Sequence, residues 1–177
     1  MRESLHSRVL ARVTGLFDSA LIQNNLRGLY MEHVVAEILG KDWSVVGQDW
    51  ASWDLEHRDG TRIEVKQSAA RQTWSAEQSP LHTARFSIRK PQLTYAGNVS
   101  TDCTDRPSKI FIFAWNGTAD ETADHRDKRQ WQFFVLSRED LPDQKSIGLS
   151  GLQQRTEPVA ADRLGVAVEA LRIGGQG

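Results

Sequence analysis

Two short runs in which apolar and charged residues alternate constrain the fold of this chain more than any other feature. The runs are Trp53–Glu56 and Ile63–Lys66, and a glycine-bearing turn separates them. Strict alternation is typical of strands that bury one face, because successive side chains on a strand point to opposite sides. The pattern therefore predicts an antiparallel β-hairpin within residues 52–69.

The length of the turn decides which residues of the hairpin face each other. A two-residue turn at 59–60 would place Leu55 opposite Glu64 and put the two charged sets on opposite faces. A three-residue loop over 58–60, with its glycine in the left-handed conformation, places Asp54 opposite Glu64 instead. We predict the three-residue loop, because it gives both strands a common apolar face.

The other face of the predicted hairpin is charged. Its members are Asp54, Glu56, Arg62, Glu64 and Lys66. Carboxylates gathered at cross-strand distance need cations to offset their charge. Ion pairs on a solvated hairpin are one interpretation. The sharper interpretation is a divalent-metal site, because converging hard oxygen ligands suit Mg²⁺ or Mn²⁺.

Asp54 followed by Glu64-Val65-Lys66 at the end of a hairpin resembles the D…ExK signature of the PD-(D/E)xK nuclease superfamily. The resemblance implies the restriction-endonuclease-like fold, an α/β three-layer core in which helices flank a central mixed sheet of about five strands, here with an extra N-terminal helix. It implies that Asp54, Glu64 and the main-chain carbonyl of Val65 bind Mg²⁺, with Mn²⁺ as an alternative. Asp54, Glu64 and Lys66 would then be the catalytic residues, with Lys66 orienting the attacking water or stabilising transition-state charge.

A helix predicted over residues 26–39 precedes the hairpin, and Gly40 is well suited to end it. Two acids flank its apolar arc, Glu32 just beyond one edge and Glu37 on the opposite flank. Many superfamily members carry a metal-binding glutamate on the first core helix, in a G-x-x-x-E setting similar to Gly28 and Glu32. The resemblance implies Glu32 as a further metal ligand, with Glu37 as the second choice. A solvated acid at the helix rim is the alternative.

The remaining periodicity predicts further elements around the hairpin. An amphipathic helix over residues 3–23 would pack on the domain or on a partner subunit. The nearly continuous apolar run 109–115 is typical of a central strand buried on both faces. The other predicted segments are strands at 43–47 and 131–136, a short helix at 91–97, an exposed connection at 116–130, an edge strand at 146–149 and a final helix at 161–172.

Residues 67–108 show little periodicity and contain more basic than acidic residues. Phosphate contacts and base stacking beside the catalytic face are one interpretation, and an ordinary surface loop is the other. The candidate nucleic-acid-binding residues are Arg71, Trp74, Arg85, Arg89 and Lys90. We assign supporting roles to Glu56 and to Gln67, which strict alternation turns to the face opposite Lys66.

The composition limits the classes that remain. A chain of 177 residues is typical of one domain, here with a core at 26–136 between an N-terminal helix (1–25) and a C-terminal extension (137–177). The net charge of −1 argues against a protein that coats nucleic acid by charge alone. The single Cys103 excludes an internal disulfide and a cysteine-based structural zinc site. With neither a secretory signal nor an apolar run of about 20 residues, we expect a cytoplasmic protein without a membrane partner.

These patterns favour a magnesium-dependent endonuclease that acts on DNA. A homodimer formed through the first helix is a further hypothesis. One alternative is a non-catalytic nucleic-acid-binding or assembly module that keeps the nuclease fold. Another is a plain α/β protein with a salt-bridged hairpin. The form of the nucleic acid, whether duplex, branched, single-stranded or RNA, stays open at this point.

Overall fold

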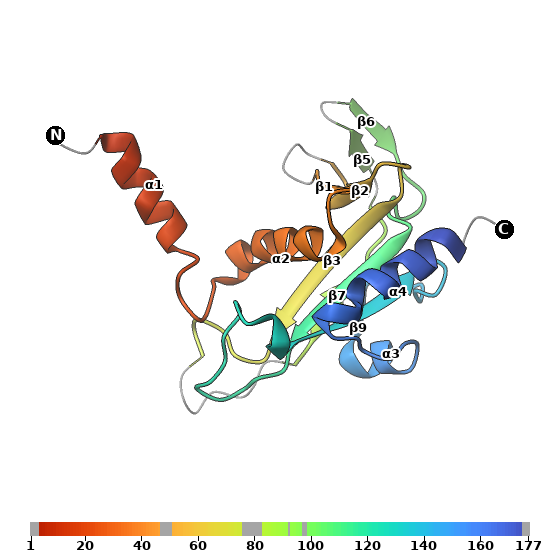
Figure 1. The fold of residues 1–177 in the computed structure, drawn as a ribbon. Coiled ribbons are helices and arrows are strands. Elements are labelled where there is room, and N and C mark those ends of the chain that lie inside the picture. Colours follow the sequence, from red (N-terminus) through yellow and green to blue (C-terminus); the bar gives the residue numbers. More distant parts are fainter. Residues whose placement is uncertain (1–3, 47–50, 76–82, 92, 97–98, 175–177) are drawn as a thin grey trace.

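The computed structural model describes residues 4–46, 51–75, 83–91, 93–96 and 99–174. A mixed sheet with the strand order β1-β2-β3-β7-β8 forms the centre of the fold (Figure 1). Its strands are β1 (Trp43–Val45), β2 (Leu55–His57), β3 (Arg62–Ala69), β7 (Ile110–Asn116) and β8 (Trp131–Ser137). β3 and β7 run parallel, and the other neighbours run antiparallel. The predicted α/β class with a mixed sheet of five strands is confirmed.

The hairpin of β2 and β3 has the predicted register. Leu55 pairs with Ile63, which places Asp54 opposite Glu64. Gly60 has a φ of 85°, the left-handed conformation that glycine tolerates best, and its N–H donates to the His57 carbonyl at 2.8 Å. The three-residue loop is therefore confirmed.

Helices cover one face of the sheet. α2 (Asn24–Leu39) and α4 (Ala161–Gly174) lie side by side there (Figure 1). The buried side chains of this layer are Met31, Val35, Leu164 and Val168 from the helices, packed on Ile63, Val65, Ile112 and Phe133 of the sheet. Leu164 and Val168 thus form the inner face of the last helix. Among the described helices, none has the length and apolar character needed to span a bilayer.

A smaller layer covers the opposite face of the sheet. It consists of a two-stranded sheet of β4 (Arg85–Ser87) and β9 (Ser146–Gly148), followed by α3 (Leu149–Gln153). Its buried side chains pack on the alternate residues of the central strands: Phe86, Ile147 and Leu152 lie against Phe111, Phe113 and Phe134. Successive residues of β7 therefore enter different cores, which explains the continuous apolar run of this strand.

The first two helices differ from the prediction at their ends. α1 (Leu5–Gly15) is shorter than the predicted helix over 3–23, because the chain tightens into i→i+3 hydrogen bonds after it and then leaves the helical path. α2 begins at Asn24, two residues before the predicted start at residue 26. The Asn24 side-chain oxygen accepts hydrogen bonds from Arg27 and Gln67, and these contacts outweigh the low helix propensity of asparagine. Gly40 ends α2 with a φ of 87°, as predicted.

Three shorter segments also correct the prediction. The helix expected at 91–97 is instead a hairpin of β5 (Leu93–Ala96) and β6 (Val99–Asp102), while residues 92 and 97 lie outside the described part. Valine, threonine and tyrosine in this stretch favour the strand. The edge strand at 146–149 ends at residue 148, pairs with β4 outside the main sheet, and passes directly into α3. The strand at 43–47 is confirmed as far as Val45, and residue 47 is not among the described residues.

The connection at 116–130 is not simply exposed, because His125 is buried within it, only 1 % exposed. The His125 Nδ1 accepts the Ile22 N–H at 3.0 Å, and its Nε2 lies 3.2 Å from the Arg71 carbonyl, to which it donates. Trp131 donates its indole N–H to the His125 carbonyl at 3.0 Å. A neutral imidazole thus joins three segments that are distant in the sequence, which a polar composition does not reveal.

We expect His125 to make the fold sensitive to acid. Burial, followed by the charge of Arg27, lowers the pKa of His125 to about 4 from its ordinary 6.5. Because the pKa is lower in the folded protein, the full stability is present above about pH 6.5 and is lost as the pH falls through about 4. We expect the free energy of unfolding to decrease by about 2–3 kcal/mol over this range. Urea unfolding of the protein and of His125→Gln between pH 4 and 7 measures it. Equal pH slopes for the two proteins would contradict the assignment.

Candidate functional site

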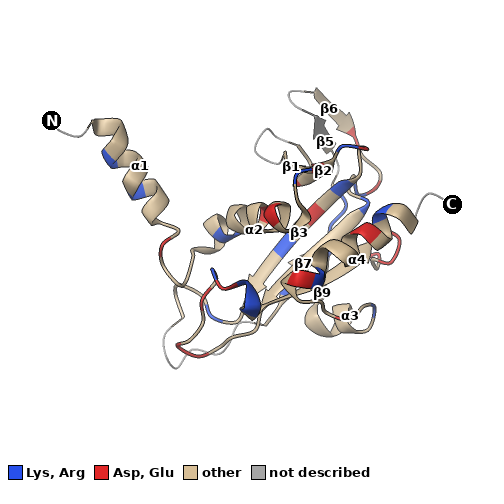
Figure 2. Cartoon of the chain, viewed as in Figure 1, with Lys and Arg blue, Asp and Glu red and all other residues tan. Residues whose placement is uncertain are grey.

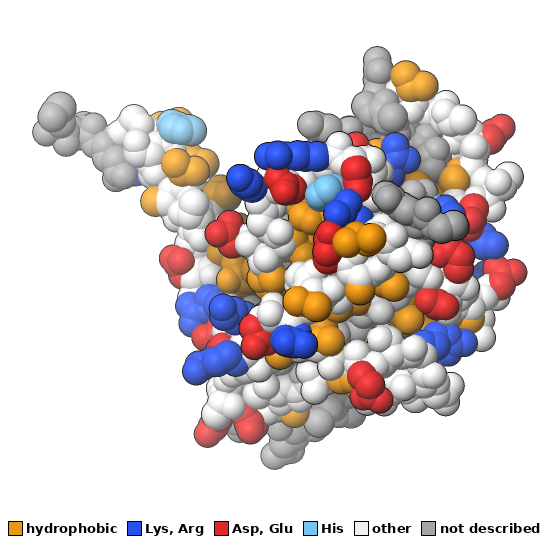
Figure 3. All heavy atoms as spheres, turned by 45° about the vertical axis from the view of Figure 1, so that its right-hand side comes forward, with side chains coloured by type: hydrophobic (Ala, Val, Ile, Leu, Met, Phe, Trp, Pro, Cys, Tyr) orange, Lys and Arg blue, Asp and Glu red, His pale blue; other side chains and the backbone are white. Residues whose placement is uncertain are grey.

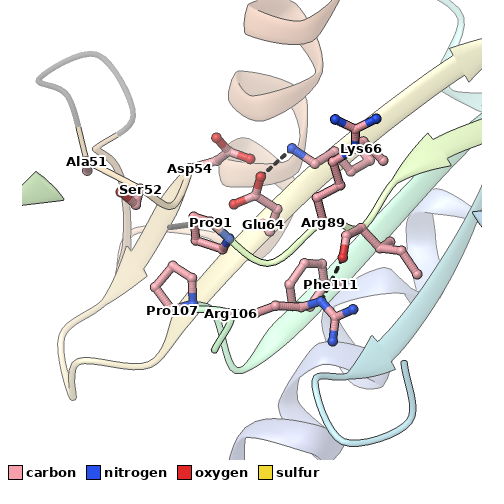
Figure 4. A pocket seen from close by; sticks show the side chains of 12 residues that line it. Ala51, Ser52, Asp54, Glu64, Lys66, Arg89, Pro91, Arg106, Pro107 and Phe111 are labelled. Carbon is pink, nitrogen blue, oxygen red and sulfur yellow. Dashed lines mark hydrogen bonds and ion pairs between the residues drawn. The ribbon is translucent and has the colours of Figure 1, made fainter. Parts of the chain in front are cut away.

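A cavity of about 310 Å³ opens on the face of β3 that carries Glu64 and Lys66 (Figure 4). Asp54, from the segment before β2, points into the same space. The opposite wall is formed by Ser87 at the end of β4, by Ile88, Arg89 and Pro91 after it, and by Pro107, which precedes β7. The three predicted catalytic side chains therefore meet in one cavity.

Alternation along β3 explains why the charged residues reach this cavity. Ile63 and Val65 point into the core beneath α2, so Glu64 and Lys66 point to the other face. β2 begins only at Leu55, which leaves the edge of β3 beside Glu64 without a strand. The Asp54 carboxylate occupies this edge, where its Oδ2 accepts the Val65 N–H at 2.7 Å.

The main-chain carbonyl of Val65 is directed toward the same edge. The Ile63 carbonyl accepts the Asp54 N–H at 3.0 Å, which shows that residue 63 turns its polar backbone groups toward β2. On a strand the N–H and C=O of one residue point to the same side, and this direction repeats every second residue. The Val65 carbonyl therefore lies beside the carboxylates of Asp54 and Glu64 as a third oxygen donor.

Burial, followed by the nearby charge of Glu64, raises the pKa of Asp54 to about 7. The Val65 N–H and the Lys66 ammonium group lower it only in part. The Asp54 carboxyl is thus only partly ionised at neutral pH, because burial disfavours its charged form and Glu64 repels it. A cation bound directly to Asp54 and Glu64 would relieve this repulsion.

Lys66 forms a direct ion pair with Glu64 inside the cavity (Figure 4). Burial lowers the pKa of Lys66, but the charges of Glu64, Asp54 and Glu32 outweigh it, so the net direction is upward. The ammonium group is therefore protonated at neutral pH. In this state Lys66 is a cation and hydrogen-bond donor, not a general base.

Glu32 approaches the site from the other side of the sheet. Its helix, α2, covers the face opposite the cavity, yet the Glu32 carboxylate lies in electrostatic range of Glu64 and Asp54. Burial raises the pKa of Glu32, and the charge of Glu64 adds to this effect. Within the described ranges, no three His, Cys, Asp or Glu side chains form a cluster that could hold a metal ion. The structure thus places Glu32 in electrostatic range of Glu64 without a ligand cluster, and Glu37 lies in a separate groove.

The remaining oxygen donors suit a divalent cation. Asp54, Glu64 and the Val65 carbonyl are hard ligands, which Mg²⁺ and Mn²⁺ prefer. Mg²⁺ commonly uses one or two carboxylates and keeps several waters, so it needs no third acid. The raised pKa of Asp54 shows that its ionised form is unfavourable in the cavity, and a bound cation would favour that form. These residues therefore fit the metal that the sequence resemblance implies.

Of the predicted nucleic-acid-binding residues, Arg89 lines the cavity (Figure 4). The structure does not bring the other four to it. Lys90 forms an ion pair with Asp143 at 3.4 Å, and Arg85 is exposed on β4. Arg71 and the exposed Trp74 follow the far end of β3. Charged residues are scattered over the elements of the fold and not gathered in one stripe (Figure 2).

Arg106 is a cavity residue that the sequence does not single out. Its side chain is buried, with Nε donating to the Ile88 carbonyl at 2.9 Å and an Nη donating to the Pro142 carbonyl at 3.1 Å. These bonds fix the backbone next to Arg89. No local pattern marks Arg106, because its partners lie 18 and 36 residues away in the chain.

The two residues assigned supporting roles take part in other contacts. Glu56 accepts a hydrogen bond from Arg62 at 3.3 Å, and the Arg62 guanidinium lies 3.6 Å from the centre of the Trp53 ring. Glu56 thus belongs to a surface cluster outside the cavity. Gln67 points to the opposite face of β3, as predicted, and its Oε1 accepts a hydrogen bond from Arg27 at 2.6 Å.

Arg27 is a fully buried cation behind the site. It donates to the side-chain oxygens of Gln67, Gln72 and Asn24 and to the Ile22 carbonyl, and its Nη1 lies 3.5 Å from the His125 Nδ1. Its hydrogen-bond partners in the described ranges are therefore uncharged groups. Burial lowers the pKa of Arg27 to about 10. The guanidinium connects the start of α2 to β3 one residue after Lys66.

Comparison of the chain with protein-family models, with curated proteins and with solved structures finds no match.

Proposed function

We propose that the chain is a metal-dependent phosphodiester hydrolase that cleaves DNA, with the restriction-endonuclease-like fold. One observation carries the proposal: Asp54 lies opposite Glu64 at the open end of a hairpin, and Lys66 shares their cavity. The element order also supports it, because a helix and three antiparallel strands are followed by a strand parallel to β3. The sequence resemblance to the PD-(D/E)xK superfamily rests on the same residues.

Asp54, Glu64 and the Val65 carbonyl would hold Mg²⁺, which supplies a water of lowered pKa and offsets the charge of the phosphate. Lys66 remains protonated, so it orients the attacking water and stabilises negative charge on the phosphate in the transition state. Arg89 in the cavity wall binds a phosphate oxygen. The direct ion pair of Lys66 with Glu64 keeps the ammonium group inside the cavity before substrate arrives.

Cleavage of a substrate panel tests this function. Labelled duplex, branched and single-stranded DNA and RNA are incubated with the protein and Mg²⁺, Mn²⁺ or a chelator. We expect DNA cleavage that requires the metal and is lost in Asp54→Asn. Glu56→Gln is the matched control, because it removes a carboxylate from the same hairpin outside the cavity. Cleavage that persists in Asp54→Asn would place the active site elsewhere.

A non-catalytic nucleic-acid-binding module is the second candidate. The Lys66–Glu64 ion pair favours it, because an ammonium group already offsets one carboxylate of the cavity without a metal. This alternative predicts that the panel binds to the protein and stays intact, and that Mg²⁺ leaves the melting temperature unchanged. Binding measured by fluorescence anisotropy on the same substrates separates it from the hydrolase.

A further inference from the structure

α1 is an amphipathic helix whose apolar side is uncovered. None of its residues is buried, and Figure 3 shows hydrophobic side chains on the projecting helix. Its apolar stripe, which lies within an arc of about 80° on a helical wheel, consists of Leu5 (70 % exposed), Val9 (47 %) and Val13 (49 %), continued by Leu16 (52 %). An isolated helix of 11 residues is marginal in water. The stripe therefore requires a covering surface.

The body of the same chain cannot provide this cover. The Phe17 ring stacks on Tyr30 with 6.2 Å between the ring centres, and the Ala20 carbonyl accepts the His125 N–H at 2.7 Å. Leu16 is the single residue between the end of α1 and this anchored segment. The direction of α1 is thereby fixed, and the helix points away from the sheet and its helices (Figure 1).

A groove that can accept such a helix lies on the outer side of α2. It has a volume of about 590 Å³, and Tyr30, Val34 and Ile38 give it an apolar lining. His33 and Glu37 are exposed at its rim. Tyr30 joins the groove to the anchored segment, so the groove and the base of α1 are neighbours on one surface.

We propose that two copies of the chain exchange α1, so that the helix of each copy lies in the groove of the other. A two-fold axis makes the two contacts identical and closes the assembly at a dimer. One short helix in one groove covers less than the roughly 800 Å² per partner of a stable interface. Reciprocal exchange doubles this area, because each copy contributes a helix and a groove. The groove carries charges of both signs, Glu37 together with Arg126 and Lys128, so the contact with α1 depends on the apolar side chains.

Light scattering after gel filtration tests the dimer at micromolar concentration. We expect twice the mass of one chain, and a dissociation constant raised at least about tenfold in Val9→Asp, which places a charge in the stripe. Ala11→Asp is the matched control, because it introduces the same residue on the opposite side of the same helix. Neither variant alters a buried residue. A monomeric wild-type protein, or equal effects of the two variants, would overturn the proposal.

Disulfide trapping tests the groove itself in a Cys103→Ser background. Equal amounts of Val9→Cys and His33→Cys protein are mixed and oxidised, and covalent dimers are separated without reductant. Exchange predicts a mixed dimer from the two proteins together. A covalent dimer formed by Val9→Cys protein alone would mean that two α1 helices pair with each other. A third protein carries both Val9→Cys and His33→Cys, and a disulfide within one chain of this protein would mean that α1 folds onto its own groove. Either result overturns the exchange, and neither depends on nuclease activity.

Discussion

Replacing Lys66 by alanine is expected to slow metal-dependent DNA cleavage by about 10²–10³-fold. Lys66 is the cation of the cavity that contacts Glu64, and its raised pKa keeps it charged. In the proposed mechanism, removing it takes away a hydrogen-bond donor to the phosphate and leaves the negative charge of Glu64 without its ion-pair partner. Single-turnover cleavage of the DNA identified in the substrate panel, at saturating Mg²⁺, measures the chemical step directly.

Two variants accompany this measurement. Lys90→Ala is the matched control, because Lys90 pairs with Asp143 at the surface and does not line the cavity. Lys66→Arg keeps the charge and recovers part of the rate if charge, more than shape, is what the transition state requires. Equal rates for Lys66→Ala and Lys90→Ala would remove Lys66 from the mechanism, whatever the activity of the wild-type protein.

The metal-free protein should become more stable when Asp54 is replaced by asparagine. The pKa of Asp54 in the folded protein is raised to about 7 from 3.8 by burial and by Glu64. A raised pKa means that the stability contributed by this group is fully present below about pH 3.8 and is lost as the pH rises through about 7. The asparagine variant avoids this loss, and we expect it to gain about 2–4 kcal/mol at pH 8 and little at pH 4.

Urea unfolding at several pH values in a chelator measures this difference. Glu56→Gln is again the control, since Glu56 lies outside the cavity. Added Mg²⁺ should stabilise the wild-type protein more than Asp54→Asn, because a cation that binds only the folded state stabilises it by mass action. The difference in free energy of unfolding between the two proteins should therefore become smaller. A difference in free energy of unfolding that does not change with pH would contradict the raised pKa, because it would mean that ionisation of Asp54 does not destabilise the folded protein.

The hairpin could be predicted from the sequence because its determinants are local. Alternation assigns the faces of both strands, and Gly60 sets the loop length, so the pairing of Asp54 with Glu64 follows from neighbouring residues. The same reasoning holds for β7, where an apolar run is sufficient evidence for burial on both faces. Lys66 and Gln67 take opposite sides of β3 for the same reason.

The buried polar residues could not be predicted in this way. Arg27, Arg106 and His125 are polar in the sequence, and their burial depends on partners that the fold brings from far along the chain. Without knowing these partners, burial of a charged or polar side chain is unfavourable and is not expected. The route of Glu32 to the site also depends on the fold, which brings it into electrostatic range of Glu64 and Asp54. The helical wheel places it at the edge of the apolar arc, but only the layer order shows that the sheet lies between α2 and the cavity.

The parallel contact between β3 and β7 has a consequence for the order of folding. The hairpin of β2 and β3 closes over three residues, whereas β7 pairs with β3 across the long connection from Ala69 to Ile110. Closing a long loop costs entropy before its contacts form, so this step is slow compared with the hairpin. The cavity walls at 87–91 and at Pro107 belong to that connection. During synthesis, the acids of the hairpin are therefore present well before the cavity around them, which forms only after β7 has emerged and docked.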